Sequence, residues 1–584
     1  MNYDNLIEKL IDLAIEEDIA TGDVTTGSII SSKVGAVATM KAKADGVISG
    51  IEIIKRVFLK FQQDIVWIPY VKDGDRVKKG DIVLRIEALY STLLMGERIS
   101  LNIFQRMCGI ATATSVYVKA LEGTKTELLD TRKTVPGMRV FDKMAVKHGG
   151  GTNHRMGLYD MSMIKDNHIK MAGSITKAVE QVRSAIPSTI KIEVETSNLE
   201  EVREAVAAKA DIIMLDNMDN ATMTEAVKII NGAAKTEASG NMNVERLKGV
   251  AETGVDFISV GALTHSVTAM DISMNIQTKE EELIDKINKL KKEKNAIILA
   301  HYYTNPAVQD IADFLGDSLE LSKKAGATDA DIILFCGVHF MAETASIISP
   351  NKKVLIPVLG AGCSLADGAT GEQLHQWKSE NPNGVIVSYV NTTADVKAET
   401  DYCCTSANAI NVVKSLPTDA NVLFVPDVNL GGYINKTSDR NMNLWTANCY
   451  VHHSYTTEKV LAMMEKHPQA EVLIHPEASC SCDEKILNNP KCFMYSSSGI
   501  LRHAKESENK EFIIVTEPGI LHKLQKESPE KIFIPLDEKA VCTSMKKITL
   551  ENIYEALVEE KYSVQVDKKM AEEAMLPIKR MMSL

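Results

Sequence analysis

The stretch IKIEVETSNLEEVREAVAAKADIIMLDNM (190–218) decides the fold of the first half of the chain. Two short apolar runs flank a segment whose apolar residues recur every three or four positions, the spacing of one helix face. Similar pairs of a run and a periodic segment repeat between residues 125 and 262. Repeated strand–helix units predict a parallel sheet, and this many at regular spacing predict a (β/α) barrel, closed or incomplete.

Length and composition limit the class of protein. The chain has 584 residues, enough for several domains, and 66 Lys+Arg against 78 Asp+Glu give a net charge of −12. With 45% hydrophobic and 25% charged residues it is neither disordered nor fibrous. No apolar run approaches the ~18 residues of a membrane span, and the acidic N-terminus lacks the basic start of a secretory signal. We therefore expect a cytoplasmic protein without a membrane partner.

Polar residues lie at or just past the C-terminal end of each expected barrel strand, which is the edge that carries the active site in such barrels. The segment from Arg132 to Lys170 holds eight basic and three acidic residues, a local net charge of 8 − 3 = +5 that indicates an anionic ligand. It has little aromatic interleaving and no helix-turn-helix or zinc pattern, so a small carboxylate- and phosphate-bearing molecule is favoured over nucleic acid. The edge positions are Arg132, Lys165, Glu195, Asp216, Ser239, Gly240 and Gly261.

A change of composition near Gln277–Glu282 predicts a domain boundary, and the charged stretch Glu280–Lys294 predicts a solvated helix at the start of the second half. We expect an α+β domain over residues 1–110, with residues 268–278 as candidates for packing back on it. The barrel then covers residues 111–278, and a separate domain covers residues 279–584.

The second half repeats itself. Three apolar strands end in His301, Tyr389 and His475, which are 88 and 86 residues apart. One cysteine follows each of them after 62, 60 and 67 residues, namely Cys363, Cys449 and Cys542. A fixed period with one signature marks internal repeats. We expect three αβα units (about 295–380, 381–466 and 467–560) around a pseudo-threefold axis, with three tips and three cysteines at one central site.

Three converging thiolates indicate a metal centre. A [4Fe–4S] cluster normally takes four cysteines, so three would leave one iron open to a substrate oxygen. Zinc held by the three thiolates and His475 is the alternative, although the usual short zinc spacing is absent. The other second-half cysteines fall outside the pattern, and each one alone predicts a structural role, with redox activity left open for Cys480 and Cys482.

The first 275 residues resemble nicotinate-nucleotide pyrophosphorylase, that is, quinolinate phosphoribosyltransferase. The segments that carry the resemblance are GERISLNIFQRMCGIAT (96–112), DTRKTVPGMR (130–139), GGGTNHRMGLYDMSMIKDNH (149–168), IEVET (192–196), MLDNM (214–218), EASG (237–240) and ETGVDFISVGALTHS (252–266). The resemblance implies the incomplete barrel of a type II phosphoribosyltransferase. It also implies a reaction in which quinolinate and phosphoribosyl pyrophosphate give nicotinate mononucleotide, pyrophosphate and CO2.

The same resemblance assigns roles to single residues. Arg132, His154, Arg155 and Lys165 would hold the quinolinate carboxylates, and Lys133 with Lys165 the phosphoribosyl donor. Glu195 and Asp216 would face the ribose and its Mg²⁺, with Glu193 on the same strand face as Glu195. Ser239, Gly240 and Gly261 would seat the 5′-phosphate, and Asn241 departs from the usual second glycine. Arg98 would reach into a partner subunit's site, which implies a homodimer or a larger oligomer.

Residues 282–560 resemble quinolinate synthase. The segments concerned are HYYTNPAVQDIADFLGDSLELSKKA (301–325), FMAETASIISP (340–350), GCSLADG (362–368), SYVNTTADVKAETDYCCTSANA (388–409), PDVNLGGYI (426–434), HPEASC (475–480), SSSGILRHA (496–504), TEPGILHKL (516–524) and VCTSMKKITLENIYEAL (541–557). The resemblance implies condensation of iminoaspartate with dihydroxyacetone phosphate to quinolinate on a [4Fe–4S] cluster, and is compatible with a separate L-aspartate oxidase that supplies iminoaspartate. Ala478 and the SSSG loop depart from the family pattern.

This resemblance names the cluster ligands and substrate residues. The ligands would be Cys363, Cys449 and Cys542. The substrate residues would be His301, Tyr303, Asp317, Ser318, Tyr389, Asn391, Ser406, His475, Glu477, Ser496, Ser497 and Thr516, with His301, Tyr303, Tyr389, His475 and Glu477 available for proton transfer.

The two resemblances name consecutive reactions, so we expect a bifunctional enzyme of de novo NAD biosynthesis, with quinolinate synthase and glycosyltransferase activities. Two alternatives stay open at this point. One is a pair of degenerate domains that sense these metabolites. The other is a nucleic-acid-binding protein, which salt-dependent binding would reveal.

Overall fold

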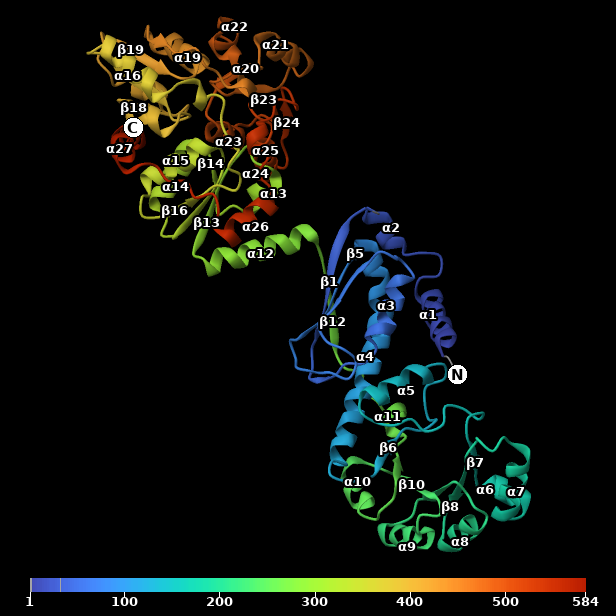
Figure 1. The fold of residues 1–584 in the computed structure, drawn as a ribbon. Coiled ribbons are helices and arrows are strands. Elements are labelled where there is room, and N and C mark those ends of the chain that lie inside the picture. Colours follow the sequence, from blue (N-terminus) through green and yellow to red (C-terminus); the bar gives the residue numbers. More distant parts are fainter. Residues whose placement is uncertain (1–2, 32, 584) are drawn as a thin grey trace. The chain divides into compact units, whose positions relative to one another are not determined.

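The computed structural model describes residues 3–31 and 33–583 of the chain (Figure 1). These residues form two compact units that meet in the sequence between Lys279 and Glu280. Both units mix helices with parallel sheets, which confirms the predicted α/β class at that level. No helix in the described part of the chain is long and apolar enough to cross a membrane.

The first unit contains an antiparallel sheet of order β12-β1-β5-β3. Its last strand, β12 (Ile272–Thr278), pairs with β1 (Gly35–Ala42), so the end of the unit returns to its start. Helix α4 (Tyr90–Ala120) covers this sheet, and its Phe104 shares a buried core with Phe58 of α3. The remaining elements of this part are α1 (Asp4–Asp18), α2 (Val24–Ile29), α3 (Ile51–Leu59), β2 (Gly46–Val47), β3 (Val66–Pro69), β4 (Arg76–Val77) and β5 (Ile82–Leu89).

The rest of the first unit is a curved, six-stranded parallel sheet of order β6-β11-β10-β9-β8-β7 (Figure 1). Its helices lie along the outer side of this curve, and the described residues show no ladder between β6 and β7. The sheet is therefore open at one seam. Its strands are β6 (Glu127–Leu129), β7 (Ser162–Ile164), β8 (Ile192–Thr196), β9 (Ile212–Asp216), β10 (Lys235–Ser239) and β11 (Phe257–Ser259).

Local sequence explains where the outer helices begin. Each of four helices follows a Ser, Asn or Asp whose side chain accepts a hydrogen bond from the first helical turn, as N-cap residues do. In β8, alternation of side chains sends Ile192 and Val194 into the apolar core and leaves Glu193 and Glu195 on the opposite face. The helices are α5 (Arg139–His148), α6 (Asp166–Ala172), α7 (Ile175–Ala185), α8 (Leu199–Ala207), α9 (Asn220–Ile230), α10 (Val244–Ala251) and α11 (Ala262–His265).

The second unit contains three four-stranded parallel sheets with the same strand order. In each sheet the first strand in the sequence pairs with the second and the third, and the fourth lies at the edge. The sheets are β14-β13-β15-β16, β18-β17-β19-β20 and β22-β21-β23-β24. Their strands are β13 (Ala296–His301), β14 (Phe314–Gly316), β15 (Ile332–Cys336), β16 (Lys353–Leu355), β17 (Val385–Tyr389), β18 (Tyr402–Cys404), β19 (Val422–Val425), β20 (Asn443–Leu444), β21 (Glu471–Ile474), β22 (Cys492–Met494), β23 (Glu511–Val515) and β24 (Ile532–Pro535).

Helices connect and cover these strands. The charged segment at the start of the unit is helix α12 (Lys279–Glu293), which buries Ile287. The last helix, α27 (Lys568–Ser583), packs Ala574, Ile578 and Met581 into the core of the second sheet. The others are α13 (Pro306–Ile311), α14 (Ser318–Ala327), α15 (His339–Ile348), η1 (Ala366–Gly368), α16 (Gly371–Glu380), α17 (Ala394–Ala398), α18 (Ala409–Lys414), α19 (Val428–Ser438), α20 (Tyr450–His453), α21 (Thr457–Lys466), η2 (Ser479–Cys482), α22 (Glu484–Leu487), α23 (Ser497–Glu506), α24 (Ile520–Glu527), α25 (Thr543–Lys546) and α26 (Leu550–Glu559).

Candidate active sites

The first unit has an open pocket at the C-terminal ends of its parallel strands, here called the barrel pocket. Ten of the residues predicted for this half line it: Arg132, Lys133, His154, Arg155, Lys165, Glu195, Asp216, Ser239, Gly240 and Gly261. Arg98 does not line it and is exposed on α4. Six strands thus bring residues that are more than 100 positions apart to one edge, because the carboxyl ends of parallel strands share that edge.

Contacts at the mouth of the barrel pocket hold several of these side chains. Lys165 Nζ lies 2.7 Å from Glu195 Oε2. Within the described residues, Arg132 Nε is buried without a hydrogen-bond partner. Gly240 has φ +95°, and a Cβ there would lie 2.2 Å from Asn217 Oδ1. Only glycine fits this turn, which places main-chain groups at the pocket wall.

Below the mouth, three side chains form a buried cluster, here called the floor cluster: His154, Glu193 and Glu237. His154 Nε2 lies 2.9 Å from Glu193 Oε2 and 3.4 Å from Glu237 Oε2. Their ligand atoms lie within 4.8 Å of one another, as a metal site would require. The resemblance did not assign either glutamate, although the alternation along β8 pointed to Glu193.

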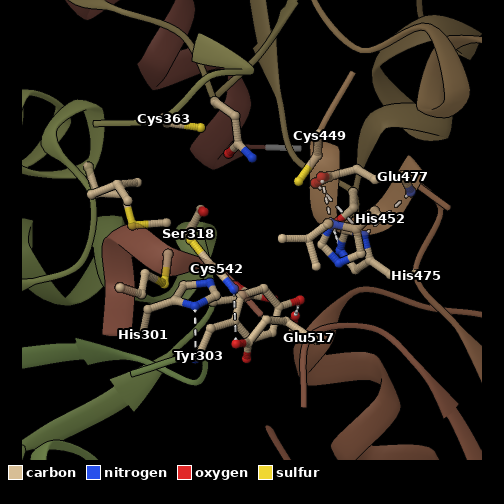
Figure 2. Close-up of a pocket in the computed structure, with 18 of the residues that line it drawn as sticks. His301, Tyr303, Ser318, Cys363, Cys449, His452, His475, Glu477, Glu517 and Cys542 are labelled. Carbon is tan, nitrogen blue, oxygen red and sulfur yellow. Dashed lines mark hydrogen bonds and ion pairs between the residues drawn. The ribbon is translucent and has the colours of Figure 1, made fainter. Parts of the chain in front are cut away.

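The second unit has a pocket where residues of the three sheets meet, here called the thiol pocket (Figure 2). The predicted residues that line it are His301, Tyr303, Asp317, Ser318, Cys363, Tyr389, Asn391, Ser406, Cys449, His475, Glu477, Ser497 and Cys542. The cysteines numbered 336, 403, 404, 480, 482 and 492 do not line it, and all ten cysteines are free thiols.

The three cysteines of the thiol pocket share one local geometry. Each precedes a helical turn, and the backbone N–H groups two and three residues further on stabilise its thiolate. Burial nevertheless raises the pKa of all three thiols, that of Cys363 to about 12. The charge of one thiolate also acts on another, Cys542 on Cys363 and Cys363 on Cys449. Figure 2 shows their sulfur atoms around one cavity.

A chain of polar contacts crosses the wall of the thiol pocket. Tyr389 Oη donates to Glu477 Oε1 at 2.5 Å, and Glu477 Oε2 lies 3.1 Å from His452 Nδ1. His452 Nε2 lies 2.9 Å from Thr516 Oγ1, which in turn lies 2.7 Å from Tyr303 Oη. Burial opposes the ionisation of Glu477, but the contacts with His452 and Tyr389 prevail and lower its pKa.

Two histidines at strand tips are held in the same way. The backbone N–H of Tyr303 donates to His301 Nδ1 at 3.2 Å, and that of Glu477 donates to His475 Nδ1 at 3.4 Å. Burial lowers the pKa of both imidazoles to about 3. Each ring is therefore neutral at pH 7, with Nδ1 as the acceptor and the proton on Nε2.

Two predicted residues, Ser496 and Thr516, do not line the thiol pocket. Ser496 caps α23, its Oγ accepting a hydrogen bond from Gly499 N, and Thr516 bonds to Tyr303 and His452. Conversely, Thr405, His452 and Glu517 line the thiol pocket although sequence reasoning did not select them. A signal existed for two of them, since His452 follows Cys449 by one helical turn and Glu517 directly follows Thr516.

Fold and sites together define two α/β enzyme units in one chain, one with a cationic barrel pocket and one with a three-thiol pocket. Residues 285–583 match the family model of quinolinate synthetase A protein. Residues 23–108 and 110–275 match the N-terminal and C-terminal domain models of quinolinate phosphoribosyl transferase.

Individual relatives agree with these family models. Quinolinate synthase of Trichodesmium erythraeum is 46% identical over 259 residues, covering 44% of this chain and 79% of the relative. That of Desulforudis audaxviator is 50% identical over 257 residues, covering 44% and 81%. The structure of NadC from Streptococcus pyogenes is 38% identical with a TM-score of 0.46, covering 48% of this chain and 98% of that one. The chain belongs to the quinolinate synthase family and carries a quinolinate phosphoribosyltransferase in its first half, so it is a bifunctional enzyme of NAD biosynthesis.

Proposed function

We propose that the thiol pocket forms quinolinate from iminoaspartate and dihydroxyacetone phosphate, and that the barrel pocket consumes it. In the second reaction quinolinate and phosphoribosyl pyrophosphate give nicotinate mononucleotide, pyrophosphate and CO2. The observation that carries the proposal is the gathering of three distant cysteines with His301, Tyr389 and His475 in one pocket. The ten free cysteines support a reducing, cytoplasmic setting.

The cofactor we propose is a [4Fe–4S] cluster on Cys363, Cys449 and Cys542. The residues fit it, because three thiols share one pocket and each has two main-chain donors that stabilise its anion. The equal strand order of the three sheets supports a pseudo-threefold arrangement in which each sheet contributes one cysteine and one tip. When bound, such a cluster supplies an iron without a protein thiolate, which acts as a Lewis acid toward a substrate oxygen.

Neutral side chains around the thiol pocket are suited to bind and orient an anionic substrate. His301 and His475 each hold a proton on Nε2 that can be donated. Among the described residues, Asn391 Oδ1 is buried without a hydrogen-bond partner, and a substrate N–H or O–H would satisfy it. Hydroxyl groups that can donate to carboxylate or phosphate oxygens belong to Ser318, Ser406 and Ser497. Burial also keeps Tyr303 and Tyr389 protonated, because it raises their pKa far above the usual value.

The barrel pocket divides into a carboxylate side and a phosphate side. Arg132 and Arg155 carry the forked guanidinium groups that hold carboxylates bidentately. Glu195 and Asp216 would stabilise the positive charge that develops on the ribose as pyrophosphate leaves, with Mg²⁺ held between carboxylates and phosphates. Lys133, Lys165, Ser239, Gly240 and Gly261 would receive the phosphoribosyl donor. Because Arg98 lies outside the pocket, we also propose a dimer in which Arg98 of the partner subunit completes it.

Anaerobic purification tests the proposal. We expect iron and sulfide in a ratio near one, and both half-reactions in the same preparation. Zinc in place of iron, or full synthase activity after removal of iron by a chelator, would refute the cluster. Absence of nucleotide formation from added quinolinate and phosphoribosyl pyrophosphate would refute the assignment of the barrel pocket.

A further inference from the structure

The three side chains of the floor cluster are almost completely shielded from solvent. Glu193 and Glu237 are fully buried, and the His154 side chain is 7% exposed. In the described part of the chain, Glu193 Oε1 and both carboxylate oxygens of Glu237 have no hydrogen-bond partner. Two carboxylates in an apolar interior are costly unless a positive charge or a proton compensates them. The imidazole between them is the group placed to provide it.

Hydrogen bonds also fix the backbone of His154. Its N–H donates to Asp130 Oδ1 at 2.9 Å, and its carbonyl accepts from Lys143 Nζ at 3.1 Å. Asp130 and Lys143 form a buried ion pair of their own. His154 lines the barrel pocket, and because its Nε2 faces the two glutamates, Nδ1 is the nitrogen left for a ligand.

The charges of the floor cluster favour the protonated form of His154. Burial opposes the charged imidazole, but Glu193 and Glu237 prevail and raise the pKa of His154 to about 9. Arg155 also interacts with Glu193, and Arg132 repels Arg155. At neutral pH, therefore, His154 is protonated.

The proposed barrel reaction needs a proton. When carbon dioxide leaves, the bond between the ring carbon and the carboxylate breaks and its electron pair stays on the ring carbon. A new C–H bond must then form there. Resting on the proposed function, we propose that Glu193 and Glu237 hold His154 as an imidazolium, and that this buried store supplies the proton to the ring carbon that loses CO2.

Protonation of the ring carbon needs no reagent other than the enzyme and solvent. His154 Nδ1 gives its proton to the carbanion and becomes neutral, and a proton from solvent restores the imidazolium. His154 would thus act on the reacting carbon, while Glu193 and Glu237 are positioning residues that act through it.

A single-turnover experiment with the full chain separates proton supply from binding. Quinolinate labelled in the departing carboxylate is mixed with phosphoribosyl pyrophosphate, and pyrophosphate and labelled CO2 are followed together. In Glu193→Gln we expect CO2 release to fall at least tenfold relative to pyrophosphate release, because an unprotonated carbanion recaptures CO2. The label would accumulate in a carboxylated nucleotide. Glu237→Gln is the second variant, for the case that the first does not fold, and Glu245→Gln, an exposed residue of α10, is the matched control.

The pH dependence gives a second readout. In the wild type we expect CO2 release to decline as pH rises through about 9, where His154 loses its proton. In Glu193→Gln this limb should move to lower pH by about one unit or more, since one stabilising anion is gone. A parallel loss of both products with a raised KM for quinolinate, or a stoichiometric divalent metal that Glu193→Gln releases, would overturn the inference. A wild type that forms no nucleotide at all would refute the proposed function, and this inference with it.

Discussion

Arg132 shows how a single side chain is prepared for a ligand. Its Nε is buried at the barrel pocket without a hydrogen-bond partner in the described part of the chain. Arg132→Lys keeps the charge but loses the planar fork. We expect the KM for quinolinate to rise about tenfold or more, since hydrogen bonds to charged groups contribute about 1.5–3 kcal/mol.

The matched control for Arg132 is Arg183→Lys. Arg183 forms a surface pair with Asp211, away from the residues that line the barrel pocket. Steady-state kinetics of nucleotide formation should show no change in this control. An unchanged KM in Arg132→Lys would remove Arg132 from the carboxylate side of the pocket.

A substitution of Cys449 tests the thiol pocket at the level of a single residue. Cys449→Ser should abolish synthase activity and lower the iron content, because a serine oxygen is a poor ligand for this soft metal centre. Nucleotide formation in the other unit should persist. Cys492→Ser is the control, because Cys492 is a free thiol outside the pocket. Full iron content and synthase rate in Cys449→Ser would exclude the proposed ligand set.

The turn after β10 decides whether the barrel pocket can receive a phosphate. Gly240→Ala would strain a backbone at φ +95° and drive a methyl group against Asn217. We expect the KM for phosphoribosyl pyrophosphate to rise more than tenfold. Gly232→Ala separates the two effects, because Gly232 has φ +77° but open space around it. It should lower the melting temperature and leave KM unchanged, whereas equal kinetic losses in both variants would contradict the steric argument.

Lys143 of helix α5 stabilises the loop that carries His154. This buried lysine pairs with Asp130 at the end of β6, so Lys143→Met leaves a carboxylate uncompensated in the interior. We expect a loss of about 3–5 kcal/mol in the free energy of unfolding of the first unit. Lys235→Met, in the exposed pair with Asp256, should lose about 1 kcal/mol or less in the same denaturant titration. Equal losses would show that burial does not set the difference.

Sequence periodicity was sufficient to predict the strands and helices. It did not show which polar side chains are buried together. Alternating strands and helices predicted the parallel sheet, and the α/β class is confirmed. The pairing of His154 with Glu237 could not be predicted, because it depends on the register of β10 beside β9 and on a loop 80 residues away. His452 was missed for a related reason, because its contact with Glu477 forms only when the second and third sheets of the unit pack together.

At the scale of the whole molecule, each pocket draws on one unit. The barrel pocket is lined by residues between 130 and 265, and the thiol pocket by residues between 301 and 545. We expect two unfolding transitions in calorimetry, since two units of this size rarely unfold as one. Phosphoribosyl pyrophosphate at about 100 times its Kd should stabilise only the first unit, by about 2.7 kcal/mol. A single transition that shifts as a whole would show that the units unfold together.

The main-chain donors behind the three pocket cysteines have a consequence for evolution. Two backbone N–H groups polarise each sulfur atom, and for Cys542 the side chain of Lys546 contributes as well. Substitutions can therefore replace the neighbours of these loops without removing that polarisation, provided the backbone path is kept. Deletions or prolines in the short turns would be far more damaging than changes of residue type, and tolerance in this region should follow loop geometry instead of side-chain chemistry.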